Sequence, residues 1–129
     1  MVARTTESNY IYIFPKAGCT SYVGRQGNGK QDVSLTDGCF TVGTILHEFM
    51  HAAGFYHEQS RADRDKYVKI NWKNIQSGKG FAFRKYNLNV ISHLKAPYDT
   101  CSIMHYSSYA FSKNGKPTIV KIHPERECW

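Results

Sequence analysis

Long apolar runs are missing from the 129-residue sequence, and none approaches the roughly 20 residues that a membrane-spanning helix needs. Residues 1–8 also lack the apolar stretch of a signal peptide, so we expect the targeting segment of an exported protein to lie outside this sequence. Internal repeats, low-complexity tracts and linkers are absent as well. The length therefore predicts a single domain over residues 1–129, with no membrane span.

Clustered positive charge is also missing. The 17 Lys and Arg residues against 10 Asp and Glu give a formal net charge of +7, which raises the question of nucleic-acid binding. The basic residues are scattered from Arg4 to Arg126, however, and no run is longer than the pair Arg84 and Lys85. No nucleic-acid module is recognisable, so the charge favours solubility or acidic partners and no nucleic-acid partner is expected.

No C-x-x-C pair occurs among the four cysteines, which argues against a zinc knuckle or a thioredoxin-type redox site. Their even number in a short chain favours disulfides and an oxidising compartment. A bridge between Cys19 and Cys39 would contribute ~3 kcal/mol by constraining the unfolded chain. The residues alone leave the pairing open, and four buried free thiols are the alternative.

The first third of the chain predicts three strands. Residues 8–15, SNYIYIFP, are rich in β-branched and aromatic residues and end at a proline. Residues 19–24, CTSYVG, and 31–36, QDVSLT, follow as two further strands. The glycines of the intervening RQGNGK suit a hairpin loop.

Residues 41–53 predict an amphipathic helix instead. Apolar residues recur there at spacings of three and four, namely Val42, Ile45, Leu46, Phe49, Met50 and Ala53. Gly54 supplies the stop, because glycine readily adopts the left-handed conformation that ends helices. Beyond Asp65 we expect a short extended segment at YVKI, a turn or helix around NWKNIQSG, and aromatic-rich loops. The fold class is α+β: a mixed sheet of few strands and one helix, followed by an irregular C-terminal half.

Three histidines and a glutamate lie close together in this helix and the turn after it, within TILHEFMHAAGFYHEQSRADRD. His47 and His51 lie four residues apart, so they share one helical face and can bind the same metal ion. Glu48 lies between them and can handle the proton of an activated water. Gly54 lets the chain turn back, so that His57 can approach as a third ligand. Three ligands leave a position open for water, as in a catalytic zinc site.

Chance is the competing explanation, since most histidines on helices are ordinary surface or core residues and the chain has six. The short H-E-x-x-H pattern is suggestive, whereas the extended H-E-x-x-H-x-x-G-x-x-H arises by chance far less often. The extended form is the metzincin pattern.

The sequence resembles one metzincin family in particular. HEFMHAAGFYHEQSRADRD is similar to the signature of the astacin family of zinc endopeptidases, including the glutamate after the third histidine and the R-x-D-R-D tail. YDTCSIMHYSSYAFSKNG resembles the Met-turn region of the same family, and GCTSYVGRQGNGKQDVSL resembles its strands before the active-site helix. The resemblance extends from about Asn9 to Val120 without a large gap.

The resemblance implies roles for individual residues. His47, His51 and His57 would bind one Zn²⁺ per chain, with Glu48 as the general base. Tyr106 would be a further zinc ligand that swings away to stabilise the oxyanion, which suits a phenol. Met104 would be the Met-turn residue near the metal. Without the resemblance, Tyr106 and Met104 would pass as ordinary core or surface residues.

The resemblance also implies what is missing. Astacin catalytic domains have a strand, a helix and another strand before residues 8–15 and a longer C-terminal segment, so we expect a partial catalytic domain with exposed apolar surface. Glu58 would lie near the buried N-terminus of a mature astacin. Cys19 and Cys39 match the first family disulfide. Cys128 would lack its usual partner, which leaves Cys101 as a candidate partner for it.

Two functions follow from these observations. The first is a secreted zinc endopeptidase acting on protein or peptide substrates, of undetermined oligomeric state. The second is a truncated zinc-binding domain with little or no proteolytic activity. Glu48 and Tyr106 favour the first, and the missing flanks favour the second.

Overall fold

The computed structural model describes residues 3–123 of the chain. It divides into two compact units, Met1–Tyr56 and His57–Trp129, which are described separately below. The prediction of one domain over residues 1–129 stays a prediction.

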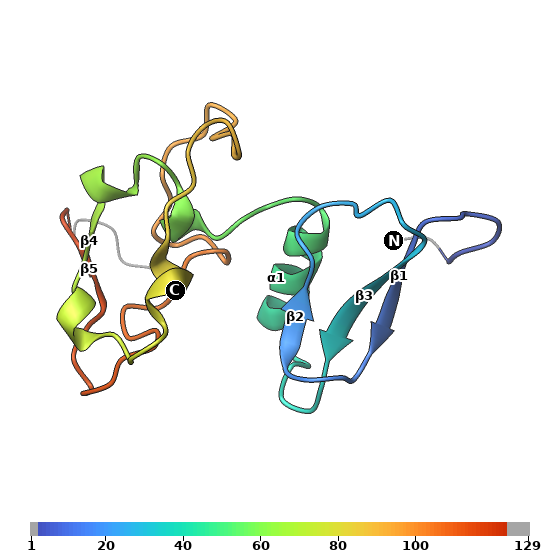
Figure 1. Cartoon of the computed structure of the whole chain (residues 1–129), viewed down its shortest axis with the longest axis horizontal. Helices are drawn as coiled ribbons and strands as arrows, with labels where there is room; N and C mark the ends of the chain where they lie inside the picture. The colour runs from blue at the N-terminus through green and yellow to red at the C-terminus, as the bar shows by residue number, and fades with distance from the viewer. Residues whose placement is uncertain (1–2, 124–129) are drawn as a thin grey trace. The chain divides into compact units, whose positions relative to one another are not determined.

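A small mixed sheet forms the first unit, with the strand order β1-β3-β2 (Figure 1). Strand β1 (Tyr10–Phe14) pairs in parallel with β3 (Lys30–Leu35), and β2 (Cys19–Ser21) pairs with β3 in antiparallel fashion. All three predicted strands are therefore confirmed, and β2 and β3 form the predicted hairpin. The loop between them contains glycines with positive φ, including Gly27 at +73°.

Helix α1 (Val42–Ala52) confirms the predicted helix to within one residue at each end. The side chain of Thr41 caps its N-terminus by accepting a hydrogen bond from the Thr44 N–H at 3.1 Å. Gly54 ends it with a φ of +108°, and its N–H donates to the His51 carbonyl at 2.8 Å. The helix packs against β2 and β3 of the sheet (Figure 1).

The core of the first unit lies between α1 and the sheet. Val33, Leu35 and Cys39 are buried, and the partly buried residues packed on them are Cys19, Ile45 and Ala52. A disulfide joins Cys19 to Cys39, as the resemblance implies. Two apolar residues of the predicted helix face are exposed, Val42 at 76% and Leu46 at 51%.

The second unit is mostly irregular, as predicted. Its only described pairing of named strands joins β4 (Val68–Ile70) and β5 (Ile119–Lys121) in antiparallel fashion, within residues 57–123. Strand β5 was not predicted. The described part of this unit also contains four short 3-10 helices, η1 (Glu58–Ser60), η2 (Arg64–Lys66), η3 (Trp72–Asn74) and η4 (Gly80–Phe83).

Aromatic and aliphatic side chains form a separate core in the second unit. The buried members are Val68, Ile70, Ile75, Phe83, Tyr98 and Ile119, and the partly buried Tyr106 and Phe111 pack against them. The suggested bridge between Cys101 and Cys128 lies outside the described residues, because Cys128 is not among them. Within residues 3–123, none of the helices has the length and apolar character needed to cross a membrane.

Candidate metal centre

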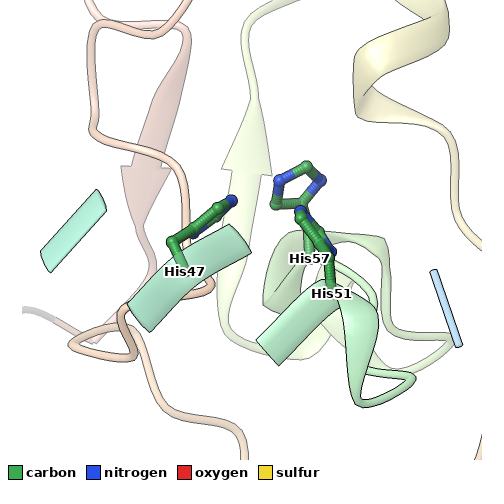
Figure 2. A group of neighbouring side chains, drawn as sticks. All are labelled: His47, His51 and His57. Atoms are coloured by element: carbon green, nitrogen blue, oxygen red, sulfur yellow. The ribbon is translucent and has the colours of Figure 1, made fainter. Parts of the chain in front are cut away.

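The structure brings the three motif histidines together. His47 and His51 project from α1, and His57 directly precedes the 3-10 turn η1. Each offers one ring nitrogen, and the three nitrogens all lie within 4.8 Å of one another. Figure 2 shows the three imidazoles gathered around a common space.

This arrangement fits a zinc ion. Nitrogens that bind one Zn²⁺ at about 2.1 Å in tetrahedral geometry stand ~3.4 Å apart, so small side-chain adjustments close the site. Three imidazoles are also a ligand set that zinc prefers, and they leave a fourth position for water.

The imidazole of His51 is already oriented for metal binding. Its Nδ1 lies 2.7 Å from the carbonyl oxygen of Phe55. A carbonyl only accepts hydrogen bonds, so Nδ1 carries the proton and Nε2 is left as the metal-binding nitrogen. Burial lowers the pKa of His51 more than this hydrogen bond raises it. The neutral form, which binds metals, is therefore favoured.

Glu48 directly follows His47 in the sequence and is buried. Its side chain is only 5% exposed, and Oε2 has no hydrogen-bond partner among residues 3–123. Burial raises the pKa of Glu48, while the charge of His47 opposes the shift. A buried carboxylate with an unpaired oxygen is suited to exchange a proton with a water molecule.

Tyr106 lies in the second unit beside His57, with their ring centroids 4.5 Å apart. Burial raises the pKa of Tyr106, and the neighbouring Tyr86 raises it further. The phenol is therefore held in its neutral, hydrogen-bond-donating form. Met104 is buried at 3% exposure, and its carbonyl oxygen accepts a hydrogen bond from the Glu58 N–H at 2.9 Å.

The segment after His57 is anchored by two arginines of the R-x-D-R-D tail. Arg61 pairs with Asp63 through two hydrogen bonds and with Glu58 through one. The carboxylate of Glu58 also accepts the Asp99 N–H at 2.9 Å. Arg64 is 4% exposed and donates to two backbone carbonyls in addition to its pair with Asp65. Through these contacts, the two arginines hold the backbone of the segment that follows the third histidine.

A comparison with family models identifies the family of the chain. Residues 1–128 match the model of the Astacin peptidase family. The chain belongs to the astacin family.

Individual astacin-family relatives agree with this result. The chain is 60% identical over 119 residues to zinc metalloproteinase nas-13 of Caenorhabditis elegans, covering 92% of the chain and 26% of that protein. It is 48% identical over 114 residues to human meprin A subunit beta, covering 88% of the chain and 16% of that protein. The chain thus spans well under half the length of these two relatives.

A solved structure of the family confirms the fold. High choriolytic enzyme 1, a hatching enzyme zinc-protease from the medaka fish Oryzias latipes, matches with a TM-score of 0.90 and 43% identity. The match covers 98% of this chain and 63% of that chain. The predicted α+β, astacin-like fold class is therefore confirmed. Zinc is the cofactor, and the three histidines lie within metal-binding distance of one another.

Sequence reasoning missed several residues around the site. The Phe55 carbonyl orients His51 through the backbone, so no side chain could have signalled it. Gln59 accepts the N–H of Tyr106 at 3.0 Å, and a glutamine outside the core motif carries no pattern of its own. Tyr86 lies among nine tyrosines and could not have been singled out. The individual roles assigned to His47, His51, His57, Glu48 and Tyr106 stay predictions.

Proposed function

We propose that this chain carries the catalytic site of a zinc endopeptidase, with one Zn²⁺ held by His47, His51 and His57. The observation that carries the proposal is the cluster of three imidazole nitrogens within 4.8 Å of one another, in a chain of the astacin family. We further propose that residues 1–129 act as one catalytic domain. The substrates are proteins or peptides.

Zinc, when bound, supplies Lewis acidity and lowers the pKa of a water molecule. The carboxylate of Glu48 then accepts a proton from the attacking water and delivers it to the departing amine nitrogen. Its burial and its unpaired Oε2 support this role. The reaction breaks the peptide C–N bond and forms a new C–O bond, and no redox step is involved.

Tyr106 is the proposed oxyanion donor and, in the resting enzyme, a further zinc ligand. A neutral phenol can donate a hydrogen bond to the negative charge that develops on the carbonyl oxygen. The raised pKa of Tyr106 and its place beside His57 support this assignment. Gly54, Glu58 and Met104 have proposed supporting roles. Gly54 shapes the turn after α1, and the hydrogen bond from Glu58 to Met104 connects the segment after His57 to the segment before Tyr106.

Export to an oxidising compartment is part of the proposal. The disulfide between Cys19 and Cys39 lies in the core of the first unit, and disulfides persist mainly in secreted proteins.

The alternative is a zinc-binding domain with little proteolytic activity. Exposed apolar side chains such as Val42 and Leu46 favour it, because exposed apolar surface is a liability for folding and solubility.

The first experiment measures zinc per chain by elemental analysis and hydrolysis of a quenched peptide with and without a chelator. One zinc per chain with chelator-sensitive cleavage supports the endopeptidase, and one zinc without cleavage supports the alternative. Glu48→Gln should abolish cleavage and keep the zinc, whereas Glu7→Gln, at an exposed carboxylate, should change neither. Cleavage that persists in pure Glu48→Gln protein would refute Glu48 as the base.

A further inference from the structure

The backbone of Tyr106 is held by side chains on both sides. Its N–H donates to the side-chain Oε1 of Gln59 at 3.0 Å. Its carbonyl oxygen lies 2.7 Å from Nδ1 of His105, which must donate because a carbonyl only accepts. The other ring nitrogen of His105 is then free to accept the hydroxyl proton of Tyr98 at 2.8 Å. The position of Tyr106 is therefore set by side-chain contacts and not by a regular strand or helix.

Gln59 links this backbone to the third histidine. It lies in η1, two residues after His57, and the preceding Glu58 N–H donates to the Met104 carbonyl at 2.9 Å. Residues 57–59 are thus attached to residues 104–106 at two points. The ring of Tyr106 packs against the His57 ring in the same unit, so a shift at either segment changes the relation between the phenol and the imidazole.

The burial of Gln59 is hard to explain by stability alone. The residue is 0% exposed, and its Nε2 has no hydrogen-bond partner within residues 3–123. A buried, unpaired amide group costs stability, and an apolar side chain of similar size would avoid that cost. What an apolar side chain would not provide is the acceptor for the Tyr106 N–H.

We propose that Gln59 is a positioning residue that fixes Tyr106 relative to His57, so that the Tyr106 hydroxyl meets the developing oxyanion. The catalytic benefit of this placement rests on the proposed function. The placement of Tyr106 itself can be measured without any catalytic assay. Small displacements of an oriented group reduce the rate of the chemical step more than they reduce substrate binding.

The first readout is hydrogen exchange at the Tyr106 amide, followed by NMR on the full chain. In the wild type this amide should be strongly protected, as should the Tyr86 amide, which donates to the Ser60 carbonyl at 2.8 Å. In Gln59→Met, which removes the amide acceptor and keeps a long unbranched side chain, Tyr106 should lose protection while Tyr86 keeps it. Gln59→Glu retains an acceptor oxygen and should protect Tyr106 as the wild type does. An unprotected Tyr106 amide in the wild type overturns the proposal even if no variant folds.

The second readout is peptide hydrolysis by the zinc-loaded chain. Gln59→Met should lower kcat by about tenfold to a hundredfold with little change in KM and one zinc per chain. Gln59→Glu should restore most of the rate. Asn74→Leu is the matched control, since Asn74 is also a buried amide of the second unit but holds the Pro117 carbonyl, and its kcat should stay unchanged.

A double variant tests whether Gln59 acts through Tyr106. In a Tyr106→Phe background, Gln59→Met should cost less than about twofold in kcat, because the group that it positions is already gone. An additional loss as large as in the wild-type background would show that Gln59 acts elsewhere and would overturn the proposal. If the zinc-loaded wild type hydrolyses no peptide, the proposed function fails, and the exchange data alone decide whether Gln59 fixes Tyr106.

Discussion

The imidazole Nδ1 of His51 donates its proton to the carbonyl oxygen of Phe55, 2.7 Å away and four residues further along the chain. Gly54 makes this contact possible, because its φ of +108° turns the chain back over the last turn of α1. The glycine that ends the helix therefore also sets the tautomer of a proposed zinc ligand. One residue connects backbone conformation, ring orientation and the proposed metal site.

Gly54→Ala should destabilise the chain by roughly 1–2 kcal/mol, because the left-handed conformation costs an alanine about that much free energy. Zinc affinity should fall as well, since the Phe55 carbonyl would no longer orient His51. Urea unfolding and zinc titration measure the two effects. Gly43→Ala, within α1 and with no positive φ, is the control and should be neutral or stabilise by up to ~1 kcal/mol. Equal effects of the two substitutions would contradict this account.

The parts of the fold that the sequence predicts are those with local signals. Helix α1 follows from the spacing of its apolar residues, and the histidine cluster follows from a motif that spans one helix and one turn. The pairing of Ile70 with Ile119 could not be predicted, because strands of three residues carry little pattern and their partners are distant in the chain. Gln59 was missed because its role depends on a hydrogen bond to Tyr106, far along the sequence.

The disulfide between Cys19 and Cys39 should contribute about 3 kcal/mol to the free energy of unfolding, since it closes a loop with a sequence separation of 20. Cys19→Ala combined with Cys39→Ala should remove that contribution. Alanine is chosen over serine because it buries no unpaired hydroxyl group. The single variant Cys39→Ala should lose a similar amount, because either change breaks the cross-link. Urea unfolding under non-reducing conditions measures both, and a loss below ~1 kcal/mol would contradict the prediction.

Arg64→Leu should destabilise the second unit by roughly 3 kcal/mol, because it leaves two buried carbonyl oxygens without their donor. Those oxygens belong to Gln59 and Phe83, at 3.2 and 2.6 Å from the guanidinium. Lys85→Ala is the control, since Lys85 pairs with the same Asp65 but is exposed, and should cost less than ~1 kcal/mol. Thermal unfolding compares them, and similar losses would show that the buried carbonyl contacts of Arg64 are unimportant.

The buried carboxyl group of Glu48 should make the stability of the metal-free chain depend on pH. Burial raises its pKa above the usual value of about 4.5, so the folded chain binds this proton more tightly than the unfolded chain does. Between the two pKa values stability therefore falls as pH rises, and the penalty persists at higher pH. Glu48→Gln removes the penalty because the amide cannot ionise.

The melting temperatures of metal-free wild type and Glu48→Gln should accordingly be close at pH 4 and diverge at pH 7, where the variant is the more stable. Other titrating groups, such as the buried His51 and the partly buried His105, are present in both proteins, so their contributions cancel to first order. Glu7→Gln should change the melting temperature at pH 7 in the opposite direction and lower it. The backbone N–H of Thr5 lowers the pKa of Glu7, so ionisation of Glu7 favours the folded chain. The same difference in melting temperature between wild type and Glu48→Gln at both pH values would mean that the pKa of the Glu48 carboxyl group is not shifted. The proposal of Glu48 as the proton acceptor would then rest on its position alone.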